Sequence, residues 1–216
     1  MKPNCEDETE RFRCFDPATL YEAAGKRGMV DPAIRPVWAG ARVCGVALTV
    51  ECPVGDNLML HQAVAEAKPG VVIVGNIGGY LFAGAWGEIL TVAAQAKGVF
   101  GVAVDGAVRD TESIFELRFP VFSRGSAIGA CTKERAGRLN FPIQFGGVTV
   151  RTGDIVCGNS DGLVIIEQER AEEIYEAAVK RQCREKEIIE QLRRGKTTLE
   201  LLGLGGFQKE MEPLSK

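Results

Sequence analysis

The sequence predicts an α/β domain built in layers, in which parallel strands are followed by antiparallel or mixed ones. Between residues 71 and 122, short apolar runs alternate with segments of helical spacing, which is typical of βαβ units and parallel pairing. Between residues 141 and 166, β-branched residues are interrupted by turns at Gly146-Gly147 and Gly153-Asp154. The 216 residues fit one compact domain with appended helices, so no second domain is expected.

The first predicted elements are a helix, a strand and a second helix. Asp16 and Pro17 form an N-cap followed by proline at the first helical position, and this helix should end near Ala24. Residues 41–52, ARVCGVALTVEC, are rich in β-branched residues and partly alternate in polarity, which predicts a strand. After a turn, residues 57–67 have helical spacing.

Two further apolar runs predict buried strands, and each leads into a loop of unusual composition. Residues 71–74 lead into the glycine-dense segment 75–79, and residues 98–104 lead into the segment 105–110. The other elements expected are a helix at about 87–97, a short helix after residue 110, a strand at 120–122, the β-rich stretch, a long charged helix at about 168–194 and a short helix at 197–202.

The two ends of the chain are expected to lie outside the domain. Residues 1–14 should form a loosely held arm, residues 15–202 the single domain, and residues 203–216 a tail. The arm is polar and acidic where a signal peptide would be apolar, and no segment approaches roughly eighteen consecutive apolar residues. We therefore expect a cytoplasmic protein with no membrane partner.

Composition also argues against two classes of site. The net charge of -3 and the pI near 5.4 provide no basic field, so nucleic acid is not expected as a partner. The 7 cysteines are scattered without a C-x-x-C pair, and there is only 1 histidine. A zinc cluster is therefore not predicted.

The first candidate for chemistry is the glycine-rich segment GNIGGYLFAGAWGEIL, residues 75–90. In α/β folds, ligands bind beyond the carboxyl ends of parallel strands. Unpaired amides where the helix begins, at residues 87–90, could bind a carboxylate or a phosphate. The alternative is a tight turn that binds no ligand.

The second candidate is the adjacent pair Arg109 and Asp110 in DGAVRD. A guanidinium can bind a carboxylate through two nitrogens or stabilise an enolate oxygen, and a carboxylate is the kind of ligand that Mg²⁺ or Mn²⁺ prefers. The alternative is a surface ion pair in which Asp110 also caps the helix that follows.

Five ordered blocks give the chain a resemblance to one family over about residues 15–202. The blocks are GDNLMLH, GNIGGYLFAGAWGEIL, DGAVRD, FPVFSRG and GDIVCGNSDGLVII. They resemble the 4-hydroxy-4-methyl-2-oxoglutarate / 4-carboxy-4-hydroxy-2-oxoadipate aldolases and their relatives, the regulators of ribonuclease E activity. The resemblance implies an α/β/β/α sandwich similar to a swivelling phosphohistidine domain. It also implies a homotrimer, or a dimer of trimers, with active sites between subunits.

The resemblance implies a role for each residue of the candidate site. Arg109 would hold the pyruvyl oxygen, Asp110 would ligate the divalent metal, and Asn57 and His61 would line the pocket. The pyruvate carboxylate would bind the amides of Gly87, Glu88, Ile89 and Leu90. For His61, a structural role on an apolar helix face remains an alternative.

Acidic residues are implied to complete the site. Glu88 stands where many family members have aspartate, so a water-mediated metal contact would have a different reach. A neighbouring subunit would contribute Glu22 and, from the C-terminal helix, Glu185 or Glu187. The alternative for these three residues is a solvated helix face.

The implied reaction is cleavage of a 4-hydroxy-2-oxo acid to pyruvate and a second oxo acid. The pyruvate enolate needs either a lysine Schiff base or a metal acting as a Lewis acid. The lysines nearest the blocks, Lys68 and Lys97, stand at helix ends, so we expect Mg²⁺ or Mn²⁺ as cofactor, with oxaloacetate decarboxylation as a side activity. The alternative is a non-catalytic modulator of a ribonuclease. A methyltransferase is not favoured, because the glycine segment does not form G-x-G-x-x-G.

Overall fold

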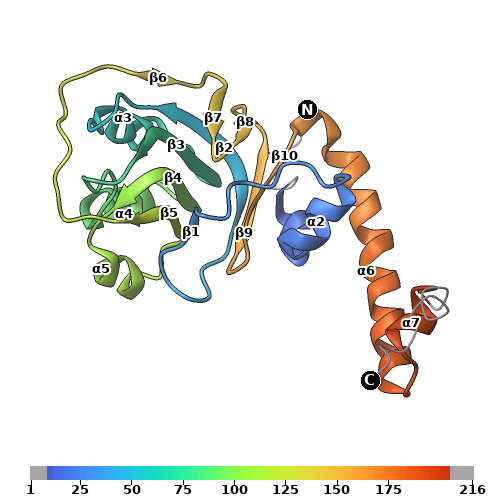
Figure 1. Cartoon of the computed structure of the whole chain (residues 1–216). Helices are drawn as coiled ribbons and strands as arrows, with labels where there is room; N and C mark the ends of the chain where they lie inside the picture. The colour runs from blue at the N-terminus through green and yellow to red at the C-terminus, as the bar shows by residue number, and fades with distance from the viewer. Residues whose placement is uncertain (1–8, 205–216) are drawn as a thin grey trace, which may run out of the picture.

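The computed structural model describes residues 9–204, and a strongly curled mixed sheet dominates it (Figure 1). The strand order is β1-β5-β4-β3-β2-β9-β10, with β6 paired to β2. Arg35 on β1 donates to the carbonyl oxygen of Asp161, in the turn between β9 and β10, at 2.9 Å. The two ends of the path therefore meet, and the sheet is nearly a closed barrel. The strands are β1 (Arg35–Pro36), β2 (Val43–Glu51), β3 (Val71–Tyr80), β4 (Gly101–Val108), β5 (Val121–Ser126), β6 (Arg138–Leu139), β9 (Ile155–Asn159) and β10 (Gly162–Ile166).

Pairing in the sheet follows the predicted division of the chain. Strands β2, β3, β4 and β5 are mutually parallel, as expected from the alternation of strands and helices. Strands β9 and β10 pair antiparallel with each other, and β9 pairs antiparallel with β2. A separate hairpin, β7 (Ile143–Phe145) and β8 (Val148–Val150), completes the β-rich stretch.

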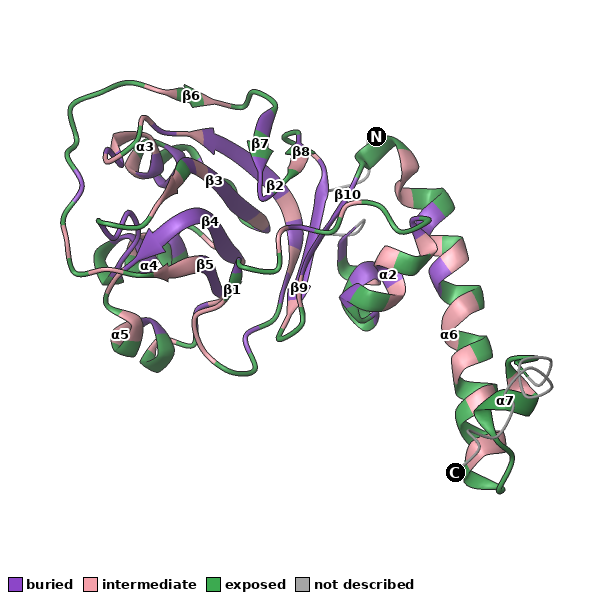
Figure 2. Cartoon of the chain, in the orientation of Figure 1, coloured by how far each residue is buried: buried purple, intermediate pink, exposed green. Residues whose placement is uncertain are grey.

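Three apolar clusters separate four layers, so the α/β/β/α arrangement is confirmed. Helices α3 (Leu58–Glu66), α4 (Glu88–Ala96) and α5 (Thr111–Glu116) cover the parallel strands through a cluster that includes the fully buried Trp86. The inner face of the sheet packs against the β7–β8 hairpin. Helices α2 (Pro17–Ala23) and α6 (Ala171–Arg193) pack on β9 and β10. All eight residues of the central strand β4 are buried (Figure 2).

Helix α6 extends far from the sheet (Figure 1), and its contacts with α2 reach as far as Glu185, which accepts the hydroxyl of Thr19 at 3.4 Å. Its buried residues are Ile174 and Ala178, beside α2, whereas the later turns are half-buried or exposed (Figure 2). The short elements are the 3₁₀ helices η1 (Arg11–Cys14) and η2 (Gln168–Arg170) and the helix α7 (Thr198–Leu201). In the described part of the chain, no helix has both the length and the apolar character to cross a membrane.

Residues 9–14, which we expected in a loose arm, form a defined contact with the domain. Phe12 is fully buried, and its ring meets that of Tyr175 edge to face at 5.7 Å between centroids. This contact places η1 on α6. Residues 1–8 and 205–216, which include most of the predicted arm and tail, lie outside the described residues.

Two predicted loops are in fact strand, and the prediction was wrong at both places. The glycine-dense segment 75–79 continues β3 to Tyr80, with a register shift between Asn76 and Tyr80 where Gly78 and Gly79 have φ of 71° and 68°. These two glycines accommodate a bulge, because only glycine adopts positive φ at little cost. Strand β4 likewise continues through Asp105 and Gly106 to Val108. A Cβ on Gly106 would lie 2.2 Å from the Cδ1 of Ile77, so close packing explains this glycine.

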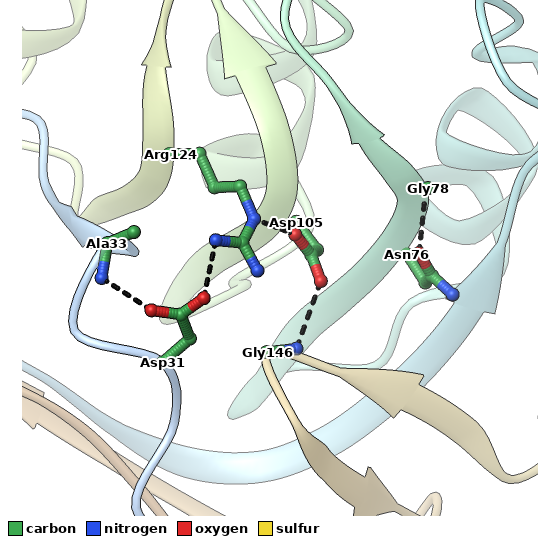
Figure 3. Close-up of polar contacts among 7 residues, drawn as sticks. All are labelled: Asp31, Ala33, Asn76, Gly78, Asp105, Arg124 and Gly146. Carbon is green, nitrogen blue, oxygen red and sulfur yellow. Dashed lines mark hydrogen bonds and ion pairs between the residues drawn. The ribbon is translucent and has the colours of Figure 1, made fainter.

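A partly buried ion cluster joins β4, β5 and Asp31, and it includes Asp105, the first residue of DGAVRD (Figure 3). Arg124 on β5 forms ion pairs with Asp105 on β4 and, at 2.6 Å, with Asp31. Asp105 also accepts the N–H of Gly146, in the β7–β8 turn, at 3.0 Å. Asp105 is therefore a structural residue that joins the parallel strands to the hairpin.

Candidate functional site

Arg109 and Asp110 leave the end of β4 on the helix-covered side of the sheet. The N–H of Arg109 donates to the carbonyl oxygen of Trp86 at 2.8 Å, which places the pair beside the start of α4. Asp110 has φ 56° and ψ 40°, a left-handed conformation that is uncommon for a residue other than glycine. The side chains of Arg109 and Asp110 are 40% and 38% exposed, so both can reach a ligand.

Two glycines create the space for this pair. A Cβ on Gly84 would lie 2.6 Å from the Cβ of Arg109, and a Cβ on Gly87 would lie 2.4 Å from Oδ2 of Asp110. Neither glycine has a positive φ. Their role is thus to allow the close approach of segment 84–87 to the Arg–Asp pair.

The carboxylate of Asp110 is bonded to helix α4 and does not cap α5. Its Oδ2 accepts the N–H of Glu88 at 3.0 Å and lies 3.6 Å from Nε of Arg109. Although Asp110 occupies the N-cap position of α5, its side chain accepts no N–H of that helix. The helix-cap alternative is therefore wrong. Of the amides at residues 87–90, that of Glu88 already has a partner.

The opposite wall of the site comes from α3 and from segment 129–135. Together with the Arg–Asp pair these enclose a cavity of about 140 Å³. The cavity is lined by Asn57, His61, Gly84, Ala85, Gly87, Ile89, Leu90, Arg109, Asp110, Ala130, Cys131 and Lys133. Segments far apart in the sequence thus converge on one small concave surface.

Asn57 lines this cavity and has a buried acceptor without a partner among the described residues. The residue is 6% exposed, and its Nδ2 donates to the carbonyl oxygen of Ala85 at 2.7 Å. Its Oδ1 is buried and has no hydrogen-bond partner among the described residues. Since buried polar atoms are almost always paired, Oδ1 of Asn57 is expected to accept a hydrogen bond from a ligand or water.

The charges around the cavity favour an anionic ligand. Two basic side chains, Arg109 and Lys133, line the cavity, whereas Asp110 is the one acidic residue among those that line it. Burial and, to a smaller extent, the positive charge of Lys133 lower the pKa of His61. Burial raises the pKa of the Cys131 thiol. His61 is therefore neutral at pH 7, and Cys131 is a thiol and not a reactive thiolate.

Asp110 could hold a divalent metal with few other protein ligands. Within residues 9–204 there is no group of three His, Cys, Asp or Glu side chains arranged to bind a metal ion. Mg²⁺ commonly uses one or two carboxylates and keeps several waters. Asp110 lines the cavity, and within the described chain only its Oδ2 has a hydrogen bond, so Oδ1 is free to bind a metal ion. This donor set fits a hydrated hard cation and does not fit zinc.

The other predicted acidic residues do not reach this cavity within one chain. Glu88 is an exposed residue in the first turn of α4. Glu22 and Glu185 lie on α2 and α6, on the other side of the sheet, where both contact Arg181, at 3.5 and 2.9 Å (Figure 1). Glu187 is exposed on α6.

Sequence reasoning did not identify Lys133, Cys131 or Gly84 as site residues. Lys133 and Cys131 belong to a segment without helix or strand, CTKERAG, which has no periodicity to place it. The expectation that the site lacks a nearby lysine was therefore incomplete. Only the hydrogen bonds that fold this segment back toward α3 bring Lys133 to the cavity.

Comparison with known proteins gives a consistent result. A family model described as RraA-like, Aldolase/RraA, matches residues 14–165. A protein of Halalkalibacterium halodurans, provisionally named a 4-hydroxy-4-methyl-2-oxoglutarate aldolase, is 34% identical over 177 residues, which cover 82% of this chain and 84% of that protein.

Solved structures show the same likeness in three dimensions. An uncharacterised protein from Pseudomonas syringae pv. tomato aligns with a TM-score of 0.82 and 27% identity, over 93% of this chain and 99% of its own. RraAS2 of Streptomyces coelicolor, described as an unusual member of a family of ribonuclease ES inhibitors, aligns with a TM-score of 0.76 and 25% identity, over 89% and 100%.

Proposed function

This chain belongs to the RraA-like, Aldolase/RraA family, and on that premise we propose that it is a metal-dependent pyruvate aldolase. The proposed reaction cleaves a 4-hydroxy-2-oxo dicarboxylic or tricarboxylic acid, such as 4-carboxy-4-hydroxy-2-oxoadipate, to pyruvate and a second oxo acid. The observation that carries the proposal is that Arg109, Asp110 and Asn57, which come from separate parts of the chain, line one small cavity.

The pyruvyl end of the substrate is assigned to the wall formed by α4 and the Arg–Asp pair. The amides of Gly87, Ile89 and Leu90 stand at the N-terminus of α4, where a carboxylate is stabilised by N–H groups and by the helix dipole. Arg109 would bind the 2-oxo oxygen and stabilise the negative charge that develops on it. Mg²⁺ or Mn²⁺, when bound at Asp110, would supply additional Lewis-acid stabilisation of that charge.

Bond cleavage requires removal of the proton on the 4-hydroxyl group. As that proton leaves, the C4–O bond becomes a carbonyl, the C3–C4 bond breaks, and its electron pair forms the enolate of pyruvate, which is then protonated at C3. Oδ1 of Asn57 would accept the hydrogen bond of the 4-hydroxyl and orient it. We assign the removal of this proton to a water molecule oriented by Glu88, or by Glu22, Glu185 or Glu187 of a neighbouring subunit.

Exposed apolar side chains beside the cavity support an assembly with sites between subunits. Phe82, Ile89 and Ile128 are 81%, 76% and 99% exposed. Phe82 and Ile128 lie next to the paired segments that contain Gly84 and Gly129, and Ile89 lines the cavity. Contact with a second copy would cover this surface, and a trimer or a dimer of trimers is the proposed state. Sedimentation equilibrium measures the mass directly, and a monomer would contradict the proposed assembly.

Lys133 raises the question of a Schiff base, which the structure disfavours. A lysine that attacks a carbonyl must be neutral, and enzymes achieve this by burying it in apolar surroundings. Lys133 is exposed and lacks such surroundings. Borohydride should therefore fail to trap pyruvate on the protein.

The experiment that tests the proposal measures pyruvate release coupled to lactate dehydrogenase. The substrates are 4-carboxy-4-hydroxy-2-oxoadipate and oxaloacetate, each with Mg²⁺, with Mn²⁺ and with EDTA. Release that requires metal and is lost in Asp110→Ala supports the aldolase. No release by a folded protein with metal present would overturn it.

A ribonuclease modulator is the second candidate, because RraAS2 is described as belonging to a family of ribonuclease inhibitors. Addition of the chain to a ribonuclease E cleavage assay tests this candidate. Inhibition that persists in Asp110→Ala, together with no pyruvate release, would favour it.

A further inference from the structure

Asp56, immediately before Asn57, is a buried carboxylate that joins the two halves of the wall opposite the Arg–Asp pair. It is 1% exposed. Its Oδ1 accepts the N–H of Leu58 at 2.9 Å. Its Oδ2 accepts the hydroxyl of Thr132 at 2.7 Å and the N–H groups of Glu134 and Arg135 at 2.8 and 3.2 Å. One carboxylate thus binds the start of α3 and three groups of segment 129–135.

These hydrogen bonds require the carboxylate to be ionised. Burial alone would raise the pKa of Asp56, but the hydrogen bonds from Glu134, Thr132, Leu58 and Arg135 hold it well below its usual range. All four partners are donors. A neutral side chain of the same shape could not accept from all of them.

Backbone hydrogen bonds continue the same connection. The N–H of Asn57 donates to Thr132 at 3.0 Å, and the N–H of Thr132 donates to Gly55 at 2.9 Å. At the other end of the segment, the N–H of Gly84 donates to Gly129 at 2.9 Å. Segment 129–135 is therefore held at both ends, and Asp56 is the side chain that fixes the end carrying Lys133.

Lys133 and Arg109 line the same cavity as the thiol of Cys131. Lys133 and Arg109 both act on this thiol, each lowering its pKa against the larger effect of burial. A substrate with two or three carboxylates needs a cation for the carboxylate that is not bound at α4. Lys133 is the side chain of the cavity wall that can supply it.

We propose that Asp56 is a positioning residue that holds Lys133 at the cavity, and that Lys133 binds the carboxylate on the C4 side of the substrate. This inference rests on the proposed aldolase function and deepens it, because it assigns the carboxylate on the C4 side of the substrate to one side chain and names the buried residue that positions that side chain. Asp56 itself touches no reacting atom.

The experiment compares Asp56→Asn, Lys133→Met and the matched pair Thr132→Val and Thr132→Ser. In Asp56→Asn, the amide nitrogen replaces one of the two acceptor oxygens. Its N–H groups then face backbone N–H donors, so the hydrogen bonds on that side are lost. Thr132→Val removes one bond to Asp56 at nearly constant volume, whereas Thr132→Ser keeps the hydroxyl. Thr132→Val keeps the test informative if Asp56→Asn does not fold.

The expected results distinguish binding of the carboxylate on the C4 side of the substrate from binding and chemistry at its pyruvyl end. KM for 4-carboxy-4-hydroxy-2-oxoadipate should rise about tenfold in Lys133→Met and Asp56→Asn, and by about threefold in Thr132→Val, as expected for loss of charged and neutral hydrogen bonds. Thr132→Ser should match wild type. The inhibition constant of oxalate, which mimics the pyruvate enolate, should change less than about twofold in every variant, since its binding wall is intact.

A double-mutant cycle gives a readout that a purely structural role would not produce. If Asp56 acts through Lys133, the KM of the double variant should equal that of Lys133→Met, because coupled residues are not additive. Multiplicative effects, an unchanged KM in Asp56→Asn, or an equal loss of oxalate binding would overturn the positioning role while leaving the aldolase intact. A wild-type protein that releases no pyruvate from any 4-hydroxy-2-oxo acid would overturn both proposals.

Discussion

The carboxylate of Asp110 accepts the backbone N–H of Glu88, with 3.0 Å between Oδ2 and the nitrogen. This hydrogen bond connects the end of β4 to the first turn of α4, and it uses only one of the two carboxylate oxygens. It also explains the left-handed backbone at Asp110, which turns the side chain toward α4 and away from α5. One residue thereby positions a carboxylate and the helix N-terminus beside it.

Asp110→Asn should retain the hydrogen bond to Glu88 and lose metal-dependent turnover. The amide oxygen can still accept the N–H, but a neutral side chain is a much weaker ligand for Mg²⁺. We expect kcat/KM to fall at least about 100-fold while the unfolding free energy changes by less than about 1 kcal/mol. Coupled pyruvate assays and urea denaturation measure both. Activity near that of wild type would remove Asp110 from the metal site.

Gly87→Ala should inactivate the protein because a Cβ there would lie 2.4 Å from Oδ2 of Asp110. The carboxylate would have to break its hydrogen bond with Glu88. The Arg109 side chain would also have to shift, because its Cγ would lie 3.1 Å from the new Cβ. Gly125→Ala is the matched control, since the nearest atom to its Cβ would be 4.0 Å away and its φ is not positive. Pyruvate release should fall at least about tenfold in the first variant only, as expected from a displacement of about 1 Å. Equal activity in both would show that Gly87 is dispensable.

Arg109→Lys tests whether the shape of the cation matters as well as its charge. A lysine keeps the positive charge but cannot bind through two nitrogens in a fixed plane. Loss of a donor to a developing oxyanion costs about 100-fold or more in kcat. Steady-state kinetics with 4-carboxy-4-hydroxy-2-oxoadipate should show this loss mainly in kcat. Turnover close to wild type would contradict the role assigned to Arg109.

His61 offers a direct test of the electrostatics of the cavity, because it is the 1 histidine of the chain. Burial and then Lys133 disfavour the charged imidazole, so its pKa lies below the ordinary 6.5. The unfolded chain binds this proton more readily, so stability should fall as the pH drops from 6.5 toward the lowered pKa of the folded protein. NMR titration of the imidazole should give a midpoint below 6.5, and Lys133→Met should raise it partway. If Lys133→Met leaves the titration midpoint of His61 unchanged, the amine of Lys133 lies too far from the imidazole to affect its pKa.

The cluster of Asp31, Asp105 and Arg124 should contribute to stability and not to catalysis. Arg124→Met removes the cation between two carboxylates and leaves Asp105 buried with only the N–H of Gly146. Breaking one partner of a buried pair costs about 3 kcal/mol, toward the lower end of the usual range because Arg124 is partly exposed. Urea unfolding measures the change. Pyruvate release at a temperature where the variant is folded should stay within about twofold of wild type.

The sequence by itself determined the order and type of nearly all the elements. Apolar runs of β-branched residues at 43–51 and 71–74 and the helical spacing after Asn57 predict local structure, since these patterns depend on neighbours in the chain. The pairing of Arg109 with Asp110 next to a buried strand also indicated where chemistry could occur. That conclusion needs only the sequence and the rule that ligands bind beyond strand ends.

Tertiary structure alone decided how the strands end and which residues share the cavity. The segments around Gly75 and Gly106 have a composition typical of loops. Hydrogen bonds from neighbouring strands nevertheless continue β3 and β4 through them. Lys133 reaches the cavity because the buried Asp56 binds its segment, although strands β3, β4 and β5 lie between these two residues in the sequence. No local pattern encodes such a contact. The carboxylate of Asp56 and its hydrogen-bond donors come together only when the chain has folded.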